Sequence, residues 1–152
     1  MSFKDAFSQG LSAAAHAESQ IKEIDSVFSE LNKQIMEASN GKIEILRMDT
    51  YEEVDLTASI TALTSVTGML NRKKIIGIFS QTPKGKNSTQ IGVVKIDKKG
   101  YPCEIKFGGD RLICEDKKSL TKALNYLLAD VEVGKTLTKL MNLEEDISDQ
   151  DL

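Results

Sequence analysis

The chain has 152 residues, a net charge of −3 and a hydrophobic fraction of 40%, which together suit one globular domain with a single core. No run approaches the ~20 apolar residues of a membrane-spanning helix, and the first residues lack the apolar centre of a signal peptide. The two cysteines are too few for a disulfide framework. We therefore expect a cytoplasmic protein that is not in the membrane.

Residues 1–40 are predicted to form one long amphipathic helix. Ser2 with Asp5 makes a variant of the capping box at its start, and Ser39, Asn40 and Gly41 suit its end. Apolar residues recur in alternating steps of four and three, which is an a/d heptad seam. Its members with a predicted role in self-association or partner binding are Phe7, Ala14, Ala17, Ile21, Ile24, Phe28 and Leu31.

Two interpretations of this seam remain open. It covers the chain's own sheet, or part of it pairs with a second copy or with another protein's helix. A helix of this length spans on the order of 50 Å, which exceeds what the sheet of a small domain can cover. The excess length favours the second interpretation, because the unpaired part would otherwise expose Phe3 and Phe7.

Residues 42–114 are predicted to be rich in β-structure. Strands are expected over 42–48, 75–80, 90–96, 102–107 and 111–114, with turns at 81–88 and 97–100. Residues 50–71 fit neither a strand nor a helix well, and we interpret them as an irregular connection. The order of these elements predicts an antiparallel meander of about four to five strands.

Gly108 and Gly109 predict a tight hairpin with a defined register. With these two residues as the loop, Cys103 faces Cys114 and Ile105 faces Leu112. The shared face is then apolar, whereas a slip of one residue would bury charged side chains. We expect two reduced core thiols; the alternatives are a cross-strand disulfide and a redox switch.

The C-terminal part is predicted to be helical over 117–141, with Asp116 as N-cap and a break or kink at Gly134. Residues 142–152 are acidic and are expected to be a disordered tail. The predicted class is thus α+β: a single domain over 1–141, in which a long N-terminal helix precedes a β-meander and C-terminal helices pack on one face.

No pattern in the chain indicates catalysis, a cofactor or a metal. His16 is the only histidine and is expected to be an exposed helix residue. One histidine and two cysteines do not make a typical zinc site, and the loop at 82–88 lacks the spacing of a phosphate-binding loop. We therefore expect a protein that is not an enzyme and that has no catalytic residue, metal or cofactor.

Charge gathers in the middle of the chain. Residues 72–111 carry ten basic and three acidic side chains, whereas the last eleven residues carry five acids and no base. An uneven distribution of charge along the chain is informative about possible binding partners, but not about the fold. The basic residues suggest nucleic-acid binding as an alternative function. The commoner interpretation is that these lysines form the solvated face of an amphipathic sheet. The lysines that would make the contact are Lys84, Lys86, Lys95, Lys98 and Lys99.

Short stretches of the sequence are similar to those of small accessory proteins of temperate phages of enteric bacteria. They are the opening from Ser2-Phe3 through His16-Ala17-Glu18, the run 100–103, the run 114–117 with Leu120, Val133-Gly134 and the run 139–141. The resemblance covers both ends of the chain, leaves out residues 50–90 and transfers no functional residue. It implies a protein that acts on host or phage components.

The leading hypothesis is a non-catalytic interaction module that self-associates through the N-terminal helix, with a homodimer favoured and an unknown protein partner. The alternatives are a nucleic-acid-associated protein that uses the basic strands, and a small inhibitor or immunity protein.

Overall fold

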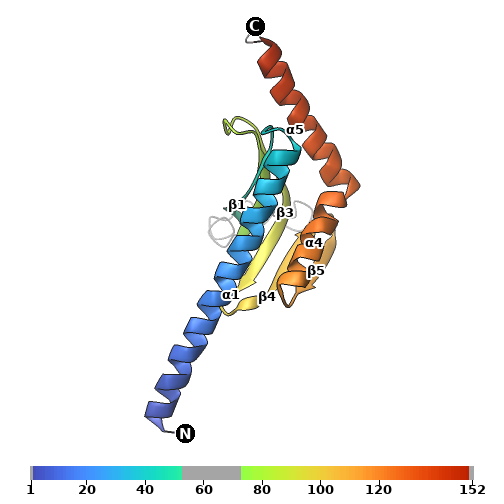
Figure 1. Ribbon diagram of the computed structural model, residues 1–152. Helices are drawn as coiled ribbons and strands as arrows, with labels where there is room; N and C mark the ends of the chain where they lie inside the picture. Colours follow the sequence, from blue (N-terminus) through green and yellow to red (C-terminus); the bar gives the residue numbers. More distant parts are fainter. Residues whose placement is uncertain (1, 53–72, 151–152) are drawn as a thin grey trace, which may run out of the picture.

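The computed structural model describes residues 2–52 and 73–150, and it confirms the α+β class (Figure 1). Helix α1 (Phe3–Ala38) comes first. A sheet follows, made of β1 (Glu44–Tyr51), β2 (Lys74–Gln81), β3 (Ser88–Asp97), β4 (Gly100–Phe107) and β5 (Asp110–Cys114). Helices α4 (Lys117–Ala129) and α5 (Val131–Gln150) close the chain. The predicted connection at 50–71 lies outside the described residues, except that β1 extends to Tyr51.

The five strands form one antiparallel meander in the order β1-β2-β3-β4-β5. Helix α1 crosses the sheet and contacts β1 and β4, while α4 packs on β4, β5 and α1, and α5 contacts α4 and β3. Apolar residues of the strands alternate, so that one face of the sheet meets these helices. The core between the two layers contains Ile24 and Phe28 of α1, Ile78, Val94 and Ile105 of the sheet, and Leu120, Leu124 and Leu127 of α4.

The predicted start and end of α1 are confirmed. The Ser2 hydroxyl accepts a hydrogen bond from the backbone N–H of Asp5, and the Asp5 carboxylate accepts one from the backbone of Ser2. This capping box satisfies backbone donors that the first turn leaves free. After Ala38 the chain turns away through Asn40 and Gly41, which both have positive φ values. The whole of Phe3–Ala38 is therefore one helix with sequence-encoded ends.

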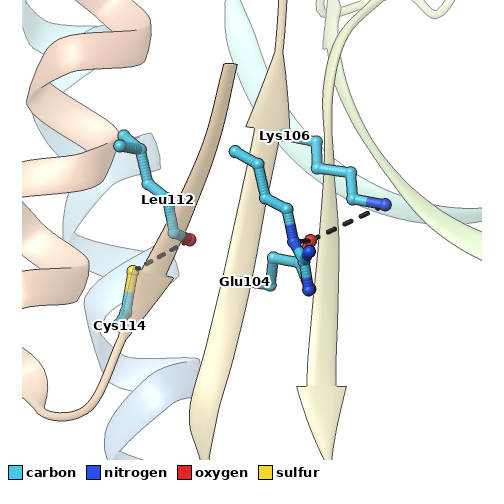
Figure 2. A network of polar contacts seen from close by, with 5 residues as sticks. Glu104, Lys106, Leu112 and Cys114 are labelled. Atoms are coloured by element: carbon cyan, nitrogen blue, oxygen red, sulfur yellow. Dashed lines mark hydrogen bonds and ion pairs between the residues drawn. The ribbon is translucent and has the colours of Figure 1, made fainter. Parts of the chain in front are cut away.

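The predicted register of the last hairpin is also confirmed. Cys103 pairs with Cys114, and Ile105 pairs with Leu112. Glu104 lies on the other face of β4 but is only 7% exposed. Its carboxylate is ion-paired with Arg111 and lies 3.6 Å from the Lys106 ammonium (Figure 2). These cations compensate the loss of water around Glu104.

The C-terminal part differs from prediction in two places. The helical break lies at Asp130 rather than at Gly134, which is inside α5. The Asp130 carboxylate accepts hydrogen bonds from the backbone of Glu132 (3.1 Å) and Val133 (3.2 Å). It thereby caps α5, whereas a glycine inside a helix costs only about 1 kcal/mol.

The expected disordered tail is wrong for residues 142–150, because α5 continues to Gln150. Once a helix is nucleated, each added residue gains one backbone hydrogen bond. Leu143, Glu144 and Glu145 also have high helix propensity. The prediction of disorder rested on the high charge of these residues and did not consider that a helix formed upstream would extend through them.

Candidate interaction site

The N-terminal half of α1 extends beyond the sheet (Figure 1). We call residues Phe3–Ser19 the arm and the rest of the described chain the body. All side chains from Ser2 to His16 are exposed. Phe3 is 98% exposed, Phe7 67% and Leu11 58%. Three large apolar side chains on one surface helix make a patch of the kind that marks interaction sites.

The arm begins where α1 is fastened to the turn between β3 and β4. The Gln20 side-chain oxygen accepts a hydrogen bond from the Tyr101 backbone N–H (3.2 Å), and the Tyr101 hydroxyl donates to Glu23 (2.9 Å). Gly100 has a φ of 98°, and a Cβ atom there would lie 2.5 Å from the Gln20 Cβ. Only glycine permits both this conformation and this close approach. The junction therefore fixes the direction in which the arm leaves the body.

Further along, α1 is held on the first strand. The Arg47 guanidinium forms an ion pair with Asp25 (2.9 Å) and lies 4.4 Å from the centre of the Phe28 ring. The Asn32 side-chain oxygen accepts a hydrogen bond from the Ile45 backbone N–H (2.7 Å). Together with the junction, these contacts hold the second half of α1 on the sheet at several points.

The seven seam residues predicted to mediate association fall into two settings. Ile24 and Phe28 are buried in the core, and Ile21, Leu31 and Ala17 are partly buried. Phe7 and Ala14 are exposed on the arm. The structure therefore places the second half of the seam on the chain's own sheet and leaves the first half uncovered.

Two grooves run along the sides of α1 on the body. The first, which we call the α1–β1 groove, has a volume of about 400 Å³ and is lined by Phe28, Ser29 and Asn32 of α1 together with Arg47, Asp49 and Ile76 of the sheet. The second, the α1–α4 groove, has a volume of about 500 Å³. Its apolar floor is formed by Val27 and Leu31 of α1 with Leu124 and Leu128 of α4. Grooves between elements of this kind accept side chains of an added helix.

The five lysines proposed for nucleic-acid contact are not brought together. Lys84 and Lys86 lie in the connection between β2 and β3, whereas Lys98 and Lys99 lie in the turn at the opposite end of β3. Ten residues of strand, on the order of 30 Å, separate the two ends. Lys95 lies on β3 itself, opposite Glu104 in the register of β3 and β4.

The two thiols lie in the core and are poorly suited to chemistry. Cys103 and Cys114 are 1% and 0% exposed. Burial raises the pKa of the Cys103 thiol to about 12 and also raises the pKa of Cys114. A thiol with a raised pKa is a weak nucleophile, because the thiolate is the reactive form. The Cys114 thiol points toward the Leu112 carbonyl at 3.8 Å (Figure 2).

The remaining polar groups that stand out have structural partners. Burial and the hydrogen bond to Glu23 raise the pKa of Tyr101, and the hydrogen bond from Arg111 lowers the pKa of Glu104. His16 is on the arm, 3.0 Å from the Gln20 side chain. Over residues 2–52 and 73–150, no three His, Cys, Asp or Glu side chains are grouped so that they could hold a metal ion.

Sequence reasoning did not find the junction or the Glu104 cluster. Gln20 and Tyr101 are 81 positions apart, and nothing local marks them as partners. The hairpin register did contain a signal for the cluster. It places Lys106 directly opposite Arg111. Glu104, diagonal to Arg111 and two residues before Lys106 on β4, supplies a carboxylate that relieves the repulsion of these two like charges.

Comparisons with protein families, with curated proteins and with solved structures found no match for this chain. No helix that the structure describes is long and apolar enough to cross a membrane.

Proposed function

We propose that this protein is a non-catalytic interaction module that self-associates through the arm, with a homodimer as the working assembly. The observation that carries the proposal is the exposure of Phe3 and Phe7 on a helix fastened rigidly to the body at Gln20 and Glu23. Burying one such side chain gains about 1.5–3 kcal/mol. Four phenylalanines in a dimer would supply a substantial part of an association free energy.

Several features support a non-catalytic role. The thiols are buried with raised pKa values, and the lone histidine is an exposed residue of the arm. Glu104 and Tyr101, whose pKa values are also shifted, form contacts that hold strands and helix in place. The resemblance to phage accessory proteins agrees with binding as the activity, and it would make a host or phage component the second partner.

Light scattering over a range of concentrations tests the self-association. We expect a mass of twice the 16.8 kDa of the chain for the unmodified protein. The double variant Phe3→Asp with Phe7→Asp should have the mass of one chain, because each carboxylate would need to lose water to enter an interface. The matched control is Gln9→Asp, on the polar side of the arm, which should remain a dimer. A monomeric unmodified protein at high concentration would contradict the proposal.

A further inference from the structure

The apolar stripe of the arm lies on the same side of α1 as the α1–β1 groove. Successive residues of an α-helix turn by about 100°, so Phe3, Phe7 and Asn32 all lie within about 40° of one another around the axis. Asn32 lines the α1–β1 groove, whereas Gln34, on the other side, lines the α1–α4 groove. The corresponding other side of the arm is polar, with Gln9. The stripe thus points to the β1 side of the molecule.

Among residues 2–52 and 73–150, the helix that contacts α1 is α4, and it lies on the other side, along the α1–α4 groove. Beside α1, the floor of the α1–β1 groove includes Arg47 and Ile76, and Ile76 is only partly buried. The arm and the groove also lie symmetrically along α1. Gln20 is midway between Leu11 and Ser29, and nearly midway between Phe7 and Asn32. A second helix laid antiparallel to α1 would therefore bring an apolar arm to each groove.

We propose that the arm of a second copy occupies the α1–β1 groove, in a two-fold symmetric dimer whose α1 helices run antiparallel about a centre near Gln20. The inference rests on the proposed self-association and adds its geometry. Phe7 of each subunit lies beside Asn32 of the partner subunit, and Leu11 lies beside Ser29 of the partner subunit. Ala6 and Gly10, which turn toward the partner's sheet, leave room for the close approach of the two layers.

Charge and area agree with this arrangement. Glu18 and Lys22 form an ion pair on one exposed turn (3.4 Å), at the centre of the proposed contact. Antiparallel helices place Glu18 opposite Lys22 of the partner subunit, whereas parallel helices place like charges opposite one another. A phenylalanine side chain has a surface of roughly 200 Å², so the exposed fractions of Phe3 and Phe7 amount to roughly 300 Å² of apolar surface per arm. Two arms and the surfaces that they cover give roughly 1,200 Å², the lower end of specific interfaces.

Disulfide mapping distinguishes the pairing directions in one protein, the double variant Leu11→Cys with Ser29→Cys. The native thiols are buried, so the introduced ones react first. Both positions are on one helix, roughly 27 Å apart, so any bond between Cys at 11 and Cys at 29 joins two subunits. We expect this 11–29 bond after mild oxidation. A bond between two copies of position 11, or no bond in a protein that is dimeric, overturns the antiparallel geometry and leaves the arm's self-association intact. A monomer would contradict both.

A matched pair of tryptophan variants tests which groove is occupied. Ser29 lines the α1–β1 groove, and Ser26 lines the α1–α4 groove; both are exposed. We expect Ser29→Trp to weaken the dimer about tenfold or more, because it fills the space that the arm needs. Ser26→Trp should leave the dissociation constant unchanged. Equal dissociation constants for the two variants, or a larger effect of Ser26→Trp, would place the arm elsewhere.

Discussion

The two halves of α1 carry the same spacing of apolar residues but have different surroundings. From Gln20 to Ala38 the stripe packs on strands and on α4, and Ile24 and Phe28 are buried. From Phe3 to Ser19 the same spacing leaves Phe3 and Phe7 exposed. Heptad periodicity indicates that a helix has something to cover, but it does not say whether the cover comes from the same chain. The place where the sheet ends decides that question.

The largest effect is expected in the half of α1 that packs on the sheet. The double substitution Ile24→Asp with Phe28→Asp puts two carboxylates into the core and should unfold the domain, with a loss above about 4 kcal/mol. This loss of unfolding free energy is measured by denaturant titration, with circular dichroism as the signal. The arm variant Phe3→Asp with Phe7→Asp is the matched control, and at concentrations where both proteins are monomeric its stability should equal that of the unmodified chain. Equal losses in the two halves would mean that the arm also packs on the body.

The junction between the halves gives the next largest effect. Gly100→Ala should destabilise the fold by about 2–3 kcal/mol, because the φ of 98° is strained for alanine and the new Cβ overlaps Gln20. Gly109→Ala is the control, since its φ of 87° is similar but no atom lies within 4 Å of the added Cβ. It should cost only about 1 kcal/mol. The difference in unfolding free energy isolates the contact between α1 and the β3–β4 turn.

A smaller effect, dependent on pH, is expected at Glu104, on the face of the sheet opposite α1 and α4. The hydrogen bond from Arg111 lowers the pKa of Glu104 in the folded state. The contribution of this ionised carboxylate to the free energy of unfolding is therefore fully present above the unfolded carboxyl pKa of about 4.3. It is lost as the pH falls through the lower pKa of the folded state. Since Arg111 and Lys106 are more than half exposed, the contribution should be only about 1 kcal/mol.

Stability measured between pH 7 and pH 2 tests this expectation. Glu104→Gln should be less stable than the unmodified protein at neutral pH, and the two should converge in acid. Glu115→Gln, at an exposed position after β5, is the control and should follow the unmodified protein. A difference between Glu104→Gln and the unmodified protein that persists unchanged to pH 2 would mean that packing, rather than charge, is responsible.

Local patterns predicted the parts of this fold that depend on neighbours in the sequence. The register of β4 and β5 followed from two glycines and an alternating pattern, and the start of α1 followed from Ser2 and Asp5. The break at Asp130 was missed because a side-chain cap outweighed the more visible Gly134. The excess length of the helix indicated that part of the seam lies beyond the sheet, but the position of the split could not be predicted, since it depends on Gln20 meeting Tyr101, far away in the chain.

Tyr101→Phe is the mildest of these changes to α1 and its contacts, because it removes one hydroxyl at the junction and keeps the ring. The lost hydrogen bond to Glu23 should cost about 1 kcal/mol, given that the contact is exposed to solvent. The hydrogen bond from the Tyr101 backbone to Gln20 remains, so the arm should keep its direction and the dimer its dissociation constant. Unfolding and light scattering on the same samples measure the two quantities. A weakened dimer at nearly unchanged stability would show that the hydroxyl aligns the arm, and that the junction serves association as well as folding.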